Sequence, residues 1–167
     1  MNKTRTLIHD IVERIDPFDG REHDVIQRVL GWLDEGQEPR LVSKFILVDH
    51  YRRSLLLVNK SGRWLPVGGP VEPFEDPRGA VLREMAEELG PRAAMVASVA
   101  MMPLFITGNA EAHLWYVVAG DEKMWLETDR QELDGHRWQP IQDVLDTNIS
   151  ELDPEMHRFT RKLLSRI

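Results

Sequence analysis

The sequence contains no cysteine among its 167 residues. This absence excludes disulfides, a thiolate nucleophile and any metal site built from cysteine. No apolar run approaches membrane-spanning length, and residues 1–15 are interrupted by charge, unlike a signal peptide. We therefore expect a cytoplasmic protein that makes no membrane contact.

An excess of positive charge is also missing. Lysine and arginine total 21 against 28 aspartates and glutamates, which gives a formal net charge of -7. With no dominant basic patch, a nucleic-acid polymer is not expected as the main ligand. A small phosphorylated ligand stays compatible with this balance, because a bound metal ion would supply positive charge. Internal repeats and low-complexity tracts are absent as well.

The length suits one domain with a sizeable core, and 42% hydrophobic and 29% charged residues are ordinary for a soluble globular chain. Within it we expect residues 1–40 to form N-terminal helices packed on the domain. Residues 41–167 are expected to form a single compact unit.

Two helices are predicted before residue 40. Residues 4–15 place apolar side chains along one helical stripe, and Asp19 with Glu22 forms a capping box for a second helix. This pair could pack on the sheet, form a homodimer contact or shape the substrate pocket. We rank packing first, because an amphipathic helix must bury its stripe.

The middle of the chain predicts strands. Residues 41–49 and 54–59 are apolar runs around a polar turn, which is typical of a β-hairpin. Residues 63–67 predict a short strand that enters a glycine pair. Residues 94–107 form an apolar segment interrupted by Pro103, which predicts two strand pieces or one bent strand.

The last third mixes both kinds of element. Residues 113–119 and 136–139 predict strands on either side of a charged loop, residues 140–146 predict a helix, and a final helix follows Asp153. Strands and helices do not alternate regularly, and a hairpin implies antiparallel pairing. We therefore predict an α/β fold of the α+β kind, with a mixed sheet between helices.

Most of the chemistry lies between Gly68 and Gly90, in the stretch GGPVEPFEDPRGAVLREMAEELG. A glycine pair opens a loop, and a short helix follows. Asp76 suits the N-cap of that helix and Pro77 its first position, while Gly90 suits the position just past its end.

Three glutamates share one face of this predicted helix: Glu84, Glu87 and Glu88. Carboxylates this close repel one another unless something neutralises them. Mg²⁺ takes oxygen ligands and commonly contacts substrate phosphates. A solvated acidic face is the plainer interpretation, but it does not explain the glycine pair or the fixed spacing of Glu75 and Arg83.

The glycine and charged positions of this stretch follow one spacing, through Gly69, Glu75, Arg83, Glu84, Glu87, Glu88 and Gly90. That spacing resembles the Nudix box of the Nudix hydrolase superfamily at every charged and glycine position. Pro91 stands where the family usually has a large aliphatic residue, and Phe74 where many members have glycine. The resemblance covers residues 41–146 and implies a Nudix α/β/α sandwich.

The resemblance also implies an activity, which is Mg²⁺-dependent hydrolysis of a diphosphate bond in a nucleoside diphosphate linked to another group. Mn²⁺ is the alternative metal, and the partner is a small-molecule nucleotide. The implied metal ligands are the Gly68 carbonyl and the carboxylates of Glu84, Glu87 and Glu88. Glu87 or Glu88 would also accept a proton from the attacking water, and the sequence does not separate ligand from base.

Further site residues are implied less directly. Glu75 and Arg83 are expected to pair and to fix the loop against the helix. Family members often add an acid from a distant loop, and in residues 120–135 we favour Glu132 over Glu127. Candidates for stacking on a nucleobase are Trp64, Phe74, Phe105 and Trp115, although such residues are more often core.

Two other functions stay open. A Nudix-fold diphosphate isomerase is disfavoured, because those enzymes resemble one another in using a catalytic cysteine. A non-catalytic Nudix-fold nucleotide sensor is the stronger alternative, although such domains often lose box glutamates that this sequence keeps. No downstream signature assigns the nucleotide derivative.

Overall fold

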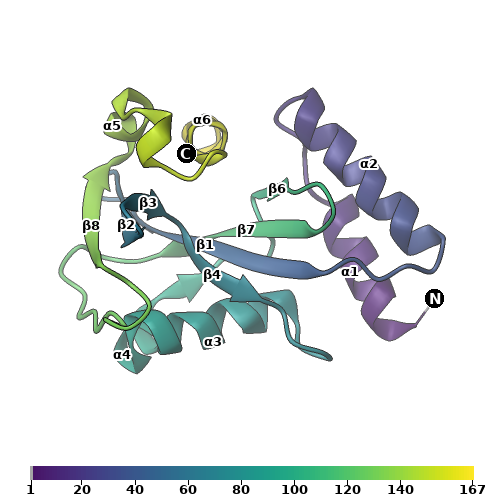
Figure 1. The fold of residues 1–167 in the computed structure, drawn as a ribbon, viewed down its shortest axis with the longest axis horizontal. Helices are drawn as coiled ribbons and strands as arrows, with labels where there is room; N and C mark the ends of the chain where they lie inside the picture. Colours follow the sequence, from purple (N-terminus) through teal and green to yellow (C-terminus); the bar gives the residue numbers. More distant parts are fainter. Residues whose placement is uncertain (1) are drawn as a thin grey trace.

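A mixed β-sheet with helices on both faces forms the centre of the computed structural model, which describes residues 2–167 (Figure 1). The strands are β1 (Leu41–Asp49), β2 (Ser54–Lys60), β3 (Arg63–Leu65), β4 (Val67–Pro70), β5 (Ser98–Val99), β6 (Phe105–Thr107), β7 (Ala112–Ala119) and β8 (Gly135–Pro140). The helices are α1 (Lys3–Glu13), α2 (Gly20–Asp34), α3 (Pro77–Leu89), α4 (Pro91–Val96), α5 (Ile141–Asp146), the 3₁₀ turn η1 (Ile149–Glu151) and α6 (Met156–Arg166).

The strands follow the order β3-β2-β1-β7-β5, with β4 on β1, β6 on β7 and β8 on β2. β1 and β7 are parallel, and the other pairs are antiparallel. The predicted β1–β2 hairpin is confirmed, with Val48 opposite Leu55. Two strands pair with the same edge of β1: β2 pairs at the end of β1, and β4 pairs along residues 42–45. Within residues 2–167, β4 pairs with no second strand.

Side chains of β1 alternate between two cores, as a pleated strand requires. Phe45 packs in the cluster that holds Met85 of α3, whereas Ile46 packs in the cluster that holds Phe159 of α6. Figure 1 shows α3 and α4 on one face of the sheet and α5 and α6 on the other. The predicted mixed sheet between helices is therefore confirmed.

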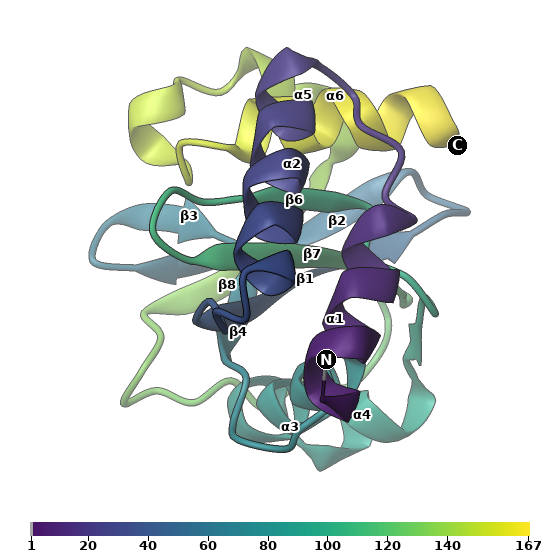
Figure 2. The same ribbon diagram turned by 90° about the vertical axis from the view of Figure 1, so that its right-hand side faces the viewer.

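The N-terminal helices cross one end of the sheet (Figure 2). Val12 of α1 and Val29 of α2 are fully buried in the same core as Leu114 of β7. No helix in residues 2–167 has the length and apolarity that crossing a bilayer requires.

Two strand pieces flank Pro103 as predicted, but the predicted start of this segment at residue 94 is wrong. Residues 94–96 lie in α4, and only β5 and β6 follow as strands on either side of Pro103. A short apolar run does not distinguish strand from helix. Here Pro91 occupies the first helical position, where its fixed φ favours a new turn of helix directly after Gly90.

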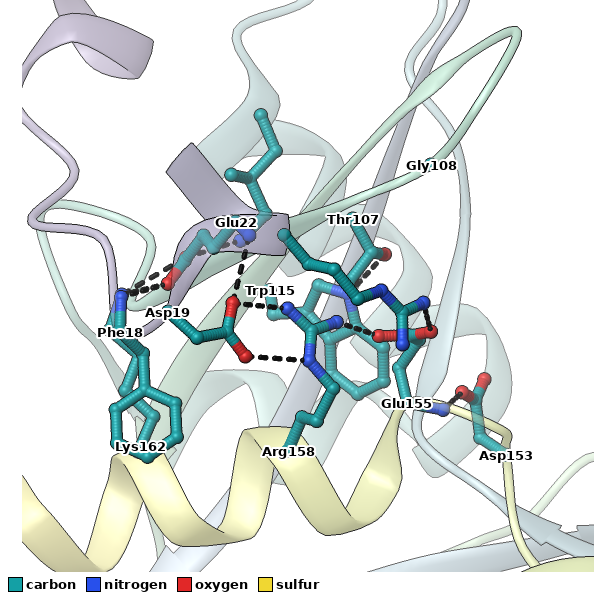
Figure 3. A network of polar contacts seen from close by, with 12 residues as sticks. Phe18, Asp19, Glu22, Thr107, Gly108, Trp115, Asp153, Glu155, Arg158 and Lys162 are labelled. Atoms are coloured by element: carbon teal, nitrogen blue, oxygen red, sulfur yellow. Dashed lines mark hydrogen bonds and ion pairs between the residues drawn. The ribbon is translucent and has the colours of Figure 1, made fainter. Parts of the chain in front are cut away.

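A fully buried ion pair joins α2 to α6 (Figure 3). Lys162 Nζ donates to both carboxylate oxygens of Glu22, at 2.9 and 3.0 Å, and the two side chains are 1% and 0% exposed. The same carboxylate accepts from the backbone N–H groups of Phe18 and Ile106. Burial lowers the pKa of Lys162 although Glu22 opposes the shift. Glu22 therefore links the start of α2 to β6 and α6.

Breaking this pair should strongly destabilise the fold. Lys162→Met leaves the Glu22 carboxylate buried without its counter-charge, and we expect a loss of about 3–5 kcal/mol in the free energy of unfolding. Denaturant titration measures the loss. Arg166→Met is the matched control on α6, because its partner Asp16 is 78% exposed and exposed pairs contribute about 0–1 kcal/mol. Equal losses in the two variants would contradict the assignment.

Candidate active site

Helix α3 begins and ends as its sequence predicts. The Asp76 side chain accepts a hydrogen bond from Arg78 N at 2.7 Å, Pro77 occupies the first turn, and Gly90 ends the helix at φ 98°. Val81 and Met85 of α3 are fully buried toward the sheet. The glutamate-bearing face therefore turns away from the centre of the core.

The glycine pair lets α3 approach β4 closely. A Cβ at Gly69 would lie 2.2 Å from Oε1 of Glu84, and one at Gly68 would lie 2.3 Å from the carbonyl oxygen of Ser43. Ser43 Oγ also donates to the carbonyl of Pro77 at 2.8 Å, which fixes the helix start against β1. A larger residue at Gly69 would collide with Glu84 of α3, whereas a larger residue at Gly68 would collide with the backbone of β1.

Arg83 lies at the centre of the site. Its guanidinium donates to both oxygens of Glu75, at 2.8 and 3.0 Å, and to the carbonyl of Pro70 at 3.0 Å. It also lies 2.8 Å from Glu84 Oε1 and 3.5 Å from Glu87 Oε2. Arg83 lowers the pKa of Glu75, and Glu75 in turn raises the pKa of Arg83. The structure thus brings Glu75 and Arg83 together and joins loop, strand and helix through one cation.

Glu88 occupies a different environment from its neighbours. Burial first, and then the negative charge of Glu84, raises its pKa to about 7, against the opposing effect of Lys60. The charge of Glu132 also raises the pKa of Glu88, whereas a hydrogen bond from the backbone of Gly68 lowers it. The surroundings of Glu88 therefore disfavour the charged form of its carboxylate, and the protein does not fully compensate that charge.

The loop before β8 runs along the end of α3. Asp129 N donates to the carbonyl of Glu88 at 3.0 Å, and Glu132 lies within the electrostatic reach of Glu88. The Glu127 carboxylate instead accepts from Trp125 Nε1 at 2.9 Å. Of the two loop acids considered, Glu132 is the one whose charge acts on Glu88, and its carboxylate lies 3.8 Å from Lys60 Nζ.

The donor set fits a hard divalent cation by chemistry. Carboxylate oxygens are the ligands Mg²⁺ prefers, and Glu88 carries uncompensated charge. In residues 2–167 no three His, Asp or Glu side chains converge as a preformed metal cluster. Two of the helix carboxylates contact Arg83 instead, so a bound cation would compete with that guanidinium for Glu84 and Glu87.

The aromatic candidates divide into two groups. Phe74 is 97% exposed at φ 65°, and Trp64 is half-buried beneath the guanidinium of Arg137, 4.1 Å from its ring. Phe105 and Trp115 are fully buried against Phe159. The prediction that these two rings stack on a base is wrong for this structure, because α6 covers that face of the sheet.

A polar cavity of about 470 Å³ was missed by the sequence analysis. It lies on the α6 side of the sheet and is lined in part by Arg28, Lys44 and Arg158. The available signal was Lys44, a cation within the largely apolar sequence of β1.

The fold and site together define a class, which is a mixed α/β domain with a glycine pair and a carboxylate-bearing helix. The NUDIX domain family model matches residues 38–163, and the chain belongs to this family. It is a Nudix hydrolase. Among curated proteins, comparison finds no significant sequence match.

Solved structures show the same fold at low identity. A NUDIX family hydrolase from Clostridium perfringens has 15% identity and a TM-score of 0.61, over 78% of this chain and 99% of its own. An Ap4A hydrolase from C. elegans has 18% identity and a TM-score of 0.62, over 74% and 96%. The E. coli dihydroneopterin triphosphate pyrophosphohydrolase has 14% identity and a TM-score of 0.57, over 76% and 96%.

Removing either partner of the Glu75–Arg83 pair should destabilise the protein, and the effects should not add. We expect the double variant Glu75→Ala/Arg83→Ala to lose less than the sum of the single losses, with a coupling of about 0.5–3 kcal/mol. Thermal and denaturant unfolding of the three variants measure this. Simple additivity would show that the contact carries no energy.

The pKa of Glu88 predicts a pH-dependent stability of the metal-free protein. Because the folded pKa of about 7 exceeds the ordinary 4.5, this group stabilises the fold below pH 4.5 and the contribution is lost as pH rises through 7. Glu88→Gln should therefore gain melting temperature relative to wild type between about pH 5 and about pH 8 in chelator. Glu87→Gln is the control, since its side chain is 58% exposed. A constant difference across this range would contradict the shifted pKa.

Proposed function

We propose that the protein hydrolyses a diphosphate bond in a nucleoside diphosphate linked to another group, in a reaction that depends on Mg²⁺, with Mn²⁺ as the alternative. The observation that supports the proposal is the carboxylate-bearing face of α3 beside the glycine pair, where Glu84 lies against Gly69 and the charges of Glu84 and Glu132 help to raise the pKa of Glu88. We assign the metal to the Gly68 carbonyl and the carboxylates of Glu84, Glu87, Glu88 and Glu132. The names of the Ap4A and dihydroneopterin triphosphate enzymes support a small phosphorylated substrate.

A divalent cation at this site supplies charge neutralisation for the phosphate oxygens and lowers the pKa of a bound water. The protein's own groups do the rest. Arg83 and Glu75 hold the loop and the helix in register, so the carboxylates keep fixed positions. Glu87 or Glu88 accepts the proton of the attacking water, because both follow on the face that Glu84 begins.

Substitution of the helix glutamates tests the reaction. Glu87→Gln and Glu88→Gln should lose about a hundredfold or more in turnover while remaining folded, because each removes a base or a metal ligand but keeps its shape. Glu132→Gln should lose less and recover with more Mg²⁺, because this acid lies on a loop. Glu13→Gln, an exposed glutamate on α1, is the control.

The assay is phosphate release from nucleoside triphosphates, ADP-ribose, dinucleoside polyphosphates and nucleotide sugars, with and without Mg²⁺. Calorimetric titration of Mg²⁺ into each variant separates metal binding from proton transfer. Full activity in excess chelator would reject the metal mechanism. Wild-type turnover in both helix variants would favour the non-catalytic nucleotide sensor instead.

A further inference from the structure

The polar cavity on the α6 side of the sheet is closed on one side by α2. Figures 1 and 2 show α2 crossing the end of the sheet beside β6 and β7. Arg21, Asp24, Val25 and Arg28 of α2 all line the cavity. Their spacing of three and four residues places them on one face of the helix. This helix precedes residues 38–163, so the family domain alone does not supply this wall.

The cavity lies beside β1, the strand that pairs with the glycine-bearing strand β4. Lys44 lines it, and the residue opposite Lys44 on β4 is Gly68. Ser43 bonds to α3 on one face of β1, so Lys44 points to the other. β4 pairs with no second strand in the described chain, so no strand separates its glycine edge from a substrate that extends from one face of the sheet to the other. One end of that substrate would reach the glutamates and the other would reach the cavity.

Most cations on the cavity wall already have carboxylate partners. These pairs are Arg21 with Glu155 at 2.8 Å, Arg158 with Asp19 at 2.7 Å and Lys44 with Asp153 at 3.2 Å, and the His113 ring hydrogen-bonds Glu111 at 2.8 Å. Figure 3 shows Arg158 between Asp19 and Glu155. These groups neutralise one another and leave little charge for a ligand.

Arg28 is the exception. Across residues 2–167, no carboxylate lies within 4 Å of its guanidinium. Its Nη2 donates to the carbonyl of Gly108 at 3.1 Å, and its guanidinium lies 5.9 Å from the Trp32 ring. Its Nε is buried without any hydrogen-bond partner. This Nε is out of reach of a ligand, but the half-buried guanidinium makes no side-chain hydrogen bond other than that to Gly108 within residues 2–167, so its Nη donors suit an anion that accepts several hydrogen bonds.

We propose that Arg28 is a specificity-determining residue that binds a phosphate group of the substrate other than those of the scissile diphosphate. The inference rests on the proposed hydrolysis for its view of the cavity as part of the substrate site. A phosphate monoester on the nucleoside ribose has the required chemistry, because its three terminal oxygens match the guanidinium fork. The substrate class is then a nucleoside diphosphate derivative that carries a second, separate phosphate.

Equilibrium binding without metal tests this inference independently of turnover. The probes are AMP, adenosine 2′,5′-bisphosphate and adenosine 3′,5′-bisphosphate, titrated calorimetrically. Wild type should bind at least one bisphosphate about tenfold or more tightly than AMP, since a charge-assisted hydrogen bond contributes on that order. Arg28→Ala should bring the ratio close to one and leave AMP affinity unchanged.

Two further variants separate charge from structure. Arg28→Gln keeps a polar side chain without the charge and should lose the preference at an unchanged melting temperature, and Arg28→Lys should keep part of the preference. Arg14→Ala is the control, a 64% exposed arginine directly after α1 and outside the cavity wall. It should retain the full preference.

The outcomes are distinct. Equal affinity of wild type for all three probes, or no binding of any, would overturn the Arg28 assignment. A preference that survives in Arg28→Ala and Arg28→Gln would overturn it as well. A preference that depends on Arg28, in a protein that hydrolyses no diphosphate, would support the phosphate site and count against the proposed hydrolysis.

Discussion

The Arg83 guanidinium is the contact on which the geometry of the site depends. It holds the loop through Glu75, the strand through the Pro70 carbonyl and its own helix through Glu84. Three segments with separate backbone paths are thereby fixed to one planar group, whose fork geometry tolerates little displacement. The same cation offsets the repulsion between Glu84 and Glu87. A metal ion at this site would therefore replace part of the existing contacts of Arg83 with Glu84 and Glu87.

That arrangement requires close contact between α3 and β4. Gly69 leaves no space for a side chain beside the Glu84 carboxylate, so the absence of a Cβ is what allows a buried glutamate to lie against the strand. Glu88, one turn further on, gains its raised pKa from the same closeness, because burial and the Glu84 charge both disfavour ionisation. Packing and electrostatics are coupled here, and a change that loosens the helix would alter both.

The parts that could be predicted from the sequence are those that local rules determine. The cap at Asp76, the end at Gly90 and the shared face of the three glutamates follow from helix geometry, and the β1–β2 hairpin follows from its apolar runs. The parts that could not be predicted depend on tertiary neighbours. Trp115 is buried because α6 covers it, and nothing in the sequence of β7 says which face that helix would take. The cavity could be predicted still less, because its wall combines residues from four segments that are distant in the sequence.

The position of Arg28 depends in turn on how α2 is anchored. Apolar stripes alone allow a helix to slide, since neighbouring turns present similar surfaces. The Glu22–Lys162 pair removes that freedom: a shift of α2 by one turn, about 5.4 Å, would leave two buried charges without partners. A buried pair of this kind adds less to stability than its geometry suggests, but it specifies one register. The ion pair at the start of α2 thus fixes where Arg28, less than two turns away, meets the cavity.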